Sequence, residues 1–315
     1  MALTVTVFGA NGDQGEAQMR QLLAAGHHAI AAMRDPAQAR PGWTAMAADY
    51  RDPASLRRAC AGSDVVFLTL PSTSFQPADV VAAAADAVAA AAHDSGVGLI
   101  VFNTSMNVGS KARGFAAQDA RFAIREKLFA GPVPCIAIQP VIYLDNLLRA
   151  WALPDIQRDG VIRYPHHAGL EVCWISEDDV ARLMIAACFR PDLAGRRFNV
   201  GGRDALCGPD LARRIGAAIG RPLRFETLPV DQFADRMAAV FGGGEALDRD
   251  TLVASLSRIY DWYNSSPVRP FYVDMGPVLA ELPIALESVE QWALRQPALC
   301  SHSSRSGLDP ETSAG

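Results

Sequence analysis

The sequence predicts an α/β fold in which a Rossmann-type, doubly wound parallel sheet carries a smaller C-terminal α/β lobe. A glycine-rich loop follows the first apolar run within ten residues of the start. Apolar runs then alternate with helical patterns, which is typical of parallel strands joined by right-handed crossovers. Two of the runs, 65–68 and 99–102, are unbroken, as expected for strands covered on both faces. The 315 residues, half of them apolar, suffice for one large domain and a smaller lobe.

The first half contains six expected strands with helices between them. The strands are Leu3–Phe8, His28–Met33, Thr44–Ala47, Asp64–Leu70, Leu99–Asn103 and Cys135–Gln139. The helices, amphipathic or rich in alanine, are Gln14–Ala25, Pro53–Ala61, Ala78–Ser95 and Gln118–Ala130. We therefore expect residues 1–150 to form the Rossmann domain.

The rhythm changes after Pro140, where the expected strands become short. They are Val161–Tyr164, Cys173–Ile175, Arg197–Val200 and Leu223–Leu228, and the helices are Asp178–Phe189, Pro209–Ile219, Val230–Val240 and Arg249–Asn264. Ser176 followed by Asp179 is typical of an N-cap with an acidic first turn. We expect 151–300 to form a smaller lobe interwoven with the first domain. The polar residues 301–315 are expected to be a disordered tail.

The glycine loop runs from Gly9 to Gly15 and opens the first helix. Its residues are Gly9, Ala10, Asn11, Gly12, Asp13, Gln14 and Gly15. Gly9 permits a tight turn, Gly12 lets backbone approach a pyrophosphate, and Gly15 lets helix and strand pack closely. The helix N-terminus presents free N–H groups and a positive dipole end to the phosphates. A plain structural turn is the alternative, but the strand–loop–helix context predicts a dinucleotide site.

Arg34, at the end of the second strand, favours NADP(H) over NAD(H). NAD-specific sites usually place a carboxylate there to bond the ribose 2′-OH. A guanidinium can instead pair bidentately with a 2′-phosphate; the alternative for Arg34 is a solvated loop charge. Asp35 is expected to cap the turn beside Pro36. Asp49 is expected to face the adenine, or to cap the helix that begins at Pro53.

With these features in view, the chain resembles the NmrA-like atypical short-chain dehydrogenases. The segments that carry the resemblance are the glycine loop, Arg34, Val101–Ser105, Tyr143–Leu147, Trp174–Ala181, Phe198–Gly202 and Glu287–Trp292. The family includes NADPH-dependent quinone and isoflavone-type reductases, and also cofactor-binding regulators that catalyse nothing. The resemblance implies that 1–150 binds NAD(P) and that 151–300 is a substrate-binding lobe.

The resemblance also implies which residues lie beside the cofactor. These are the glycine-loop residues Gly9, Asn11, Gly12, Asp13, Gln14 and Gly15, with Arg34, Asp49, Tyr50, Leu70, Pro71, Asn103, Thr104, Pro140, Tyr143 and Asn146. The segment from Tyr143 to Asn146 is expected near the nicotinamide. Strand spacing alone shows only that many of these residues follow the carboxyl ends of strands, where open α/β sheets bind ligands.

The catalytic pattern departs from ordinary short-chain dehydrogenases, which use Tyr-x-x-x-Lys. No tyrosine here has a lysine four residues on. By comparison with the isoflavone-reductase branch, Arg121 takes the place of a helix lysine. It could hold a ribose hydroxyl or steady an oxyanion, but it does not release a proton at neutral pH. A helix-surface charge is the alternative for Arg121. Lys111, in the loop after the fifth strand, could enter the cleft or could be a solvated loop charge. Tyr143 could donate a proton or pack against the cofactor.

Two further groups are weaker signals. His166 and His167 are adjacent, so their side chains diverge, and no acidic ligand stands at metal spacing; we expect a loop and no metal site. Late aromatic residues are expected either as core packing or as an apolar wall for a flat substrate. These aromatic residues are Tyr260, Trp262, Tyr263, Phe271 and Tyr272.

Composition narrows the function classes. The net charge is −5 and basic residues are scattered, so a nucleic-acid partner is not expected. No segment has the length of a membrane span, since the apolar stretch 80–92 is short and contains Asp86. The start lacks a basic n-region and a cleavage site, and the six cysteines form no C-x-x-C pair. We expect a cytoplasmic protein, monomeric or homodimeric, whose partner is a small apolar substrate.

Two functions remain open at this point. The first is an NADPH-dependent reductase that transfers hydride to a conjugated or aromatic substrate such as a quinone, enone or imine. The second is a non-catalytic redox sensor that binds NADP(H). The missing lysine favours the sensor, and the apolar second lobe favours the enzyme.

Overall fold

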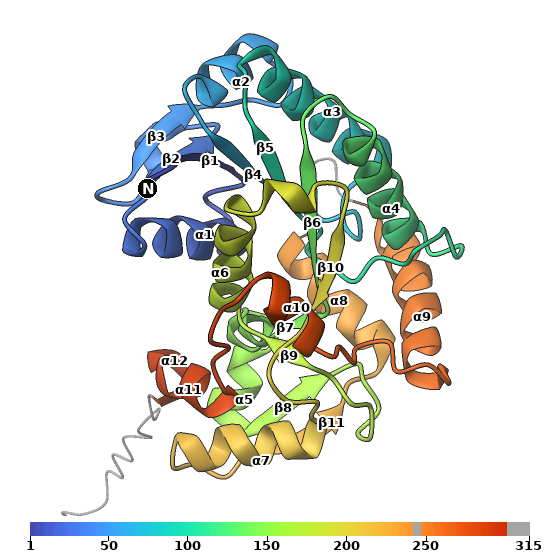
Figure 1. Ribbon diagram of the computed structural model, residues 1–315. Coiled ribbons are helices and arrows are strands. Elements are labelled where there is room, and N and C mark those ends of the chain that lie inside the picture. Colours follow the sequence, from blue (N-terminus) through green and yellow to red (C-terminus); the bar gives the residue numbers. More distant parts are fainter. Residues whose placement is uncertain (242–246, 301–315) are drawn as a thin grey trace, which may run out of the picture.

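The computed structural model describes residues 1–241 and 247–300. Its central feature is a seven-stranded sheet in the order β10-β6-β5-β4-β1-β2-β3 (Figure 1). The strands are β1 (Thr4–Phe8), β2 (His28–Met33), β3 (Thr44–Ala47), β4 (Val65–Thr69), β5 (Leu99–Asn103), β6 (Cys135–Pro140) and β10 (Arg197–Val200). Every neighbouring pair is parallel, which confirms the Rossmann-type fold predicted from the sequence.

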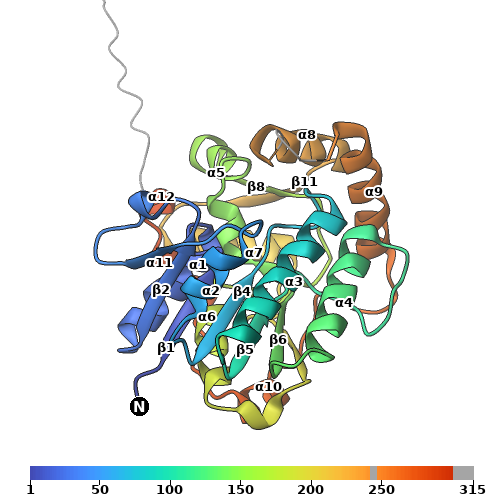
Figure 2. The same cartoon turned by 90° about the horizontal axis from the view of Figure 1, so that it is seen from above.

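Helices cover both faces of this sheet. One layer consists of α2 (Pro53–Cys60), α3 (Ala78–Asp94) and α4 (Ala116–Phe129), seen in front of the sheet in Figure 2. The other consists of α1 (Asp13–Ala24), α6 (Glu177–Cys188) and α10 (Gly276–Glu281). Every residue of β4 and β5 is buried between the two layers. The unbroken apolar runs in these strands therefore reflect a sheet that is covered on both faces.

The rest of the second half builds a smaller body with its own apolar core. Its strands are β7 (Ile142–Tyr143), β8 (Val161–Tyr164), β9 (Trp174–Ile175) and β11 (Arg224–Thr227), paired as β7 with β9 and β8 with β11. Its helices are α5 (Leu153–Asp159), α7 (Gly208–Ala218), α8 (Val230–Phe241), α9 (Arg249–Ser265), α11 (Val289–Leu294) and α12 (Pro297–Cys300). Short 3-10 turns are η1 (Pro36–Gln38), η2 (Leu144–Leu148) and η3 (Pro191–Leu193).

One expected strand of the smaller lobe lies elsewhere. Arg197–Val200 is β10, which pairs in parallel with β6 and forms the outer edge of the main sheet. Its side chains alternate: Phe198 and Val200 pack in the apolar core on the side of the sheet covered by α6 and α10, while Arg197 and Asn199 stay exposed. The helix that precedes it, α6, also packs on the main sheet beside α1. The chain thus crosses between the two bodies more than once.

Local expectations in this region agree with the structure. Ser176 caps α6, since its side chain accepts a hydrogen bond of 3.1 Å from the Asp179 N–H. The predicted disordered tail, 301–315, lies outside the described residues. Among the residues that the structure describes, no helix is both long and apolar enough to cross a membrane.

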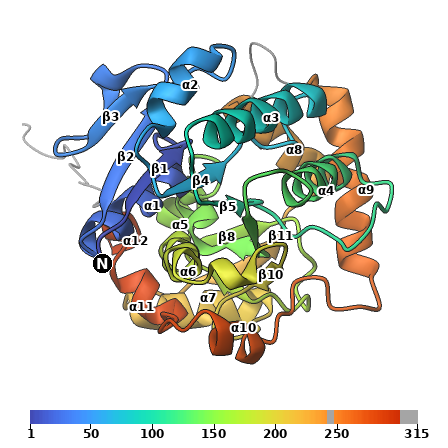
Figure 3. The same cartoon turned by 45° about the horizontal axis from the view of Figure 1, so that its top comes forward.

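The carboxyl ends of the central strands face the smaller body. Figure 3 shows α9 alongside α4 at one side of this edge, where the Gln118 side chain donates a 3.1 Å hydrogen bond to the Tyr263 hydroxyl. Helices from the second half of the chain, α8 and α9, therefore cover the carboxyl edge of the sheet. A ligand bound there meets both parts of the chain.

Candidate functional site

A cleft of about 1290 Å³ runs along the carboxyl edge of the sheet. This exceeds the roughly 300–1,000 Å³ of ordinary small-molecule pockets, so the cleft has room for an extended ligand and a second molecule. The predicted site residues that line it are Gly9, Asn11, Gly12, Asp13, Gln14, Gly15, Arg34, Asp49, Tyr50, Leu70, Pro71, Tyr143 and Asn146. Asn103, Thr104, Pro140 and Arg121 do not line it, and all four are buried.

The glycine loop forms one end of the cleft. Gly9 has φ +81°, and a Cβ there would lie 2.6 Å from the Thr69 carbonyl oxygen. A Cβ on Gly15 would overlap the Gly9 backbone, so the packing of loop and helix requires glycine at both positions. A Cβ on Gly12 would meet only the Gly9 oxygen, at 3.4 Å, an ordinary contact. The protein itself therefore leaves open space above Gly12, which fits a bound pyrophosphate.

The adenosine end of a bound dinucleotide would reach two arginines. Arg34 and Arg51 both line the cleft beyond β2 and β3, and Arg34 is exposed. Asp35 accepts a hydrogen bond of 3.1 Å from the Ala37 N–H and caps η1, as expected. The alternative in which Asp49 caps α2 is wrong, because Asp52 does so. Sequence reasoning missed Arg51, which stands one position beyond the predicted pair Asp49 and Tyr50.

Tyr143 is held by a hydrogen-bond network. Its hydroxyl lies 3.2 Å from Asn103 Nδ2 and 3.3 Å from Gln14 Oε1. Gln14 Oε1 also accepts bonds from Asn103 Nδ2, at 3.0 Å, and from the Ser105 hydroxyl, at 2.8 Å. Burial raises the pKa of Tyr143 well above its usual range. The phenol is therefore a fixed, neutral hydrogen-bond donor in the cleft.

Arg121 is completely buried, so the interpretation as a helix-surface charge is wrong. Its Nη2 donates a 2.7 Å hydrogen bond to the Pro71 carbonyl, while Nε and Nη1 have no partner in the described structure. Burial lowers the pKa of Arg121 to about 10, and the Tyr143 and Tyr50 hydroxyls oppose the fall. The group thus stays cationic at neutral pH. Buried donors without partners are costly, so the Arg121 cation keeps unused hydrogen-bonding capacity behind Pro71, which lines the cleft. Lys111, by contrast, is exposed and does not line the cleft.

Arg149 and Glu177 also line the cleft, and neither was predicted as a site residue. Arg149 follows η2 and forms ion pairs with Asp13 and, at 2.6 Å, with Glu177. Asp145 accepts a 2.8 Å hydrogen bond from the Glu177 N–H and a 3.2 Å bond from the Trp292 indole. Burial, with Asp145 nearby, raises the pKa of Glu177 to about 8.

We expect the Glu177→Gln variant to change the pH dependence of stability. The pKa of Glu177 is higher in the folded protein than in the unfolded chain, where it is about 4.3. The stability that its protonated form contributes is therefore present at low pH and is lost as the pH rises towards about 8. Asp13 and Asp145 add to this loss, and Arg149 opposes it. Relative to the variant, the wild type should lose up to about 1.4 kcal/mol per pH unit between pH ~5 and ~8.

Urea unfolding across this pH range measures the effect. Glu171→Gln is the matched control, because Glu171 is an exposed carboxylate that pairs with Arg269 and does not line the cleft. Parallel stability curves for wild type and Glu177→Gln would show that the folded protein does not hold a proton on Glu177.

The other end of the cleft is an apolar chamber beneath α3, α8 and α9. Phe75, Phe233, Met237, Leu256 and Ile259 are among its lining residues. All the charged residues that line the cleft in the described structure belong to its other end, around the glycine loop and β2–β3. They are Asp13, Arg34, Asp49, Arg51, Arg149 and Glu177.

The late aromatic residues were expected either as core packing or as an apolar wall for a substrate, and the structure contains both kinds. Tyr260 and Tyr263 are packed in the core and also line the chamber, whereas Phe271 serves the core. Tyr272 is exposed outside the cleft. His166 and His167 lie in a loop, as expected. The His166 ring is buried, with its centroid 4.7 Å from that of Tyr164 and 5.1 Å from that of Phe271, whereas His167 is exposed.

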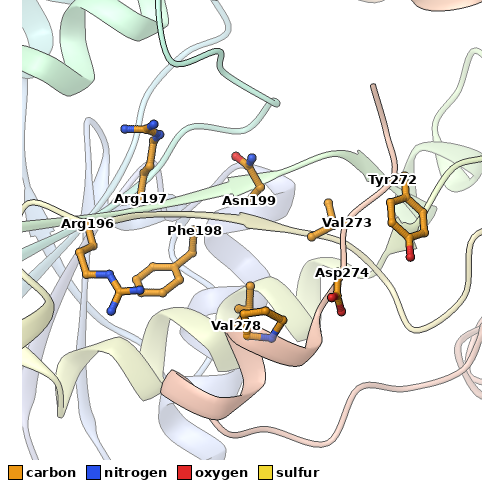
Figure 4. A pocket seen from close by; sticks show the side chains of 9 residues that line it. Arg196, Arg197, Phe198, Asn199, Tyr272, Val273, Asp274 and Val278 are labelled. Carbon is orange, nitrogen blue, oxygen red and sulfur yellow. The ribbon is translucent and has the colours of Figure 1, made fainter. Parts of the chain in front are cut away.

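A second hollow of about 310 Å³ lies along the outer strand β10 and contains none of the predicted site residues. In Figure 4, Arg197 and Asn199 point to the opposite side of the strand from Phe198, as alternation along a strand requires. The larger cleft is therefore the candidate functional site.

The fold and the cleft together define a Rossmann-type α/β protein in which a second lobe covers the glycine loop and the sheet edge. The chain belongs to the NmrA-like family, whose model matches residues 1–266. A (4-alkanoyl-5-oxo-2,5-dihydrofuran-3-yl)methyl phosphate reductase from Streptomyces griseus is 30% identical over 70% of this chain and 78% of its own. An NAD(P)H azoreductase from Xenophilus azovorans is 28% identical over 75% of this chain and 81% of its own.

Solved structures share the fold. Triphenylmethane reductase from Citrobacter sp., complexed with NADP(H), has a TM-score of 0.69 at 17% identity and covers 93% of this chain and 99% of its own. An NADPH-dependent quinone oxidoreductase from Escherichia coli, complexed with NADPH, has a TM-score of 0.69 at 19% identity, with 92% and 98% covered. NmrA, a negative transcriptional regulator in complex with NADP, has a TM-score of 0.65 at 16% identity, with 93% and 95% covered.

Proposed function

We propose that this protein is an NADPH-dependent reductase that transfers hydride to an uncharged, conjugated or aromatic acceptor such as a quinone, enone or imine. The observation that carries the proposal is the continuity of the cleft, which joins the glycine loop to an apolar chamber without charged lining residues among those described. The relatives that carry reductase names support it. The proposed setting is the cytoplasm, with the protein a monomer or homodimer.

The division of labour is part of the proposal. Residues 1–150 would bind the dinucleotide, and most of 151–300 would form the substrate-binding lobe. The glycine loop fits the pyrophosphate, because Gly12 leaves open the space that a side chain would fill. Arg34 and Arg51 would meet the 2′-phosphate, beside Asp49, Tyr50 and Leu70. Asn103, Thr104, Pro140 and Asn146 would support the nicotinamide end.

The chain supplies the proton and the charge stabilisation. When bound, NADPH supplies a hydride, which is two electrons and a proton nucleus, and the reduced acceptor then needs one further proton. Tyr143 Oη holds a proton at the cleft wall and is the proposed donor. The Arg121 cation opposes the rise in the pKa of the Tyr143 phenol, and its Nε and Nη1 donors have no partner in the described structure. It would therefore stabilise the negative charge that develops on the phenol as the proton leaves. The phenol would regain its proton from solvent.

Arg34→Ala should remove most of a preference for NADP(H) over NAD(H). We expect the wild type to bind NADP(H) at least about tenfold more tightly, which corresponds to roughly 1.4 kcal/mol for a charge-assisted contact with the 2′-phosphate. Calorimetric titration of both cofactors against both proteins measures this preference. Arg57→Ala is the control, since Arg57 is an exposed arginine paired with Asp94 outside the cleft. Equal affinities of the wild type for the two cofactors would reject this role for Arg34.

A redox sensor of the NmrA type is the second candidate. It is favoured by the absence of Tyr-x-x-x-Lys and by the high pKa of Tyr143, which makes the phenol a weak acid. A sensor would bind NADPH and NADP with different conformational consequences and reduce nothing.

An acceptor panel distinguishes the two candidates. The purified protein is mixed with NADPH and a naphthoquinone, an aryl enone, a cyclic imine or an azo dye, and NADPH absorbance is followed. The reductase predicts acceptor-dependent NADPH oxidation with at least one of these classes. Tight NADPH binding without turnover of any of them would favour the sensor.

A further inference from the structure

We propose that Arg149 makes the glycine loop able to accept a pyrophosphate by neutralising Asp13; this rests on the proposed cofactor site. Asp13 is the first residue of α1 and lines the cleft. Its carboxylate forms an ion pair with Arg149, which directly follows η2 and also lines the cleft. The pair therefore stands where the phosphates of a dinucleotide would lie.

The loop needs such a cation because it carries a negative charge of its own. An acidic residue at the start of a helix stabilises the helix through its dipole. The same carboxylate repels an anion that binds at that helix end. The residues from Gly9 to Gly15 include no lysine, arginine or histidine that could offset this repulsion. The compensating charge must come from another element.

The Arg149 guanidinium is held between two acidic side chains, those of Asp13 and Glu177. Its Nη2 lies 2.6 Å from a Glu177 carboxylate oxygen, and the Glu177 N–H is anchored by Asp145. The Arg149 side chain is 22% exposed and that of Asp13 is 59% exposed. The guanidinium is thus largely enclosed, while the carboxylate that it neutralises faces the open cleft. Without Arg149, the Asp13 carboxylate would face an incoming phosphate unpaired, whereas the raised pKa of Glu177 keeps that side chain largely protonated at neutral pH.

A double-mutant cycle tests the proposal by cofactor affinity. We expect Arg149→Gln to weaken NADPH binding by about tenfold or more, measured by calorimetry on protein whose fold is checked by circular dichroism. Asp13→Asn alone should bind NADPH at least as tightly as the wild type. The double variant should recover to within about threefold of the wild type, because the glycine loop then carries no carboxylate to repel the phosphates. Adenosine 2′-monophosphate lacks the pyrophosphate, so its affinity should be the same in all four proteins.

Arg20→Gln is the matched control. Arg20 also lies on α1 and pairs at 2.6 Å with Asp178 at the start of α6, so it joins the same two helices without lining the cleft. It should leave NADPH affinity unchanged. An unchanged affinity in Arg149→Gln would overturn the inference, as would a loss that Asp13→Asn does not rescue. Failure of the wild type to bind any dinucleotide would instead overturn the proposed function on which the inference rests.

Discussion

Gly12→Val is expected to leave a folded protein whose affinity for dinucleotides falls by at least about 100-fold. The backbone at Gly12 is extended, with φ −88° and ψ 162°, a conformation that valine adopts readily. A Cβ there would meet only one protein atom, the Gly9 oxygen at 3.4 Å, which is an ordinary contact distance. The same side chain would occupy the space that a pyrophosphate needs, so binding should be lost while stability is kept.

Thermal unfolding and NADPH titration measure the two halves of this expectation. Gly98→Val is the control, because Gly98 is also exposed and its Cβ would likewise meet one carbonyl oxygen at 3.4 Å, away from the cleft. It should bind NADPH normally. Near-native affinity in Gly12→Val would mean that the loop is only a turn.

Arg121→Ala is expected to lower kcat/KM by about 10²-fold with the best acceptor of the panel. Losing one electrostatic donor in a water-excluded site typically costs roughly 2.7–4 kcal/mol of transition-state stabilisation, and less in an open site. Arg121→Lys should restore part of the rate, because it restores a cation beside Tyr143. Steady-state rates with NADPH in excess measure both effects.

Stability separates this role from a structural one. Arg121 has two donors without partners, so the near-isosteric Arg121→Met should be as stable as the wild type or more stable. Arg125 provides the contrast on the same helix: it is equally buried, but its Nη1 donates to Gln139 Oε1 at 2.6 Å and to the Gly109 carbonyl. Arg125→Met should therefore unfold at a lower temperature. A kcat/KM unchanged in Arg121→Ala would reject the catalytic assignment of Arg121 and leave the rest of the proposal standing.

The sequence predicted the main sheet well because its signals are local. Unbroken apolar runs mark β4 and β5, and the glycine loop marks the turn from β1 into α1. Strand pairing is a long-range property, so the short alternating run at 197–200 could be recognised as a strand but not assigned to its sheet. Only the three-dimensional structure places it beside β6.

The candidate site was predicted in part, for the same reason. Residues near the glycine loop and at strand ends follow from the fold, and Arg34 stands where a strand end places it. The burial of Arg121 depends on how α4 packs against the loop that contains Pro71, and an isolated helix pattern does not show this. The link from Asp13 through Arg149 to Glu177 joins the glycine loop to residues more than a hundred positions further along the chain, and no sequence spacing indicates it.

Transfer of deuterium from NADPH to an acceptor is the measurement that tests the central claim most directly. NADPH labelled at C4 of the dihydronicotinamide is prepared as each of its two epimers and incubated with the protein and the best acceptor of the panel. A reductase that holds the cofactor in one orientation removes the label from one epimer only, so the NADP+ formed from that epimer carries no deuterium. With an enone or imine acceptor the product then carries one deuterium, in a C–D bond that does not exchange with water. NADPH that is bound tightly but leaves every acceptor unreduced and unlabelled would contradict the claim.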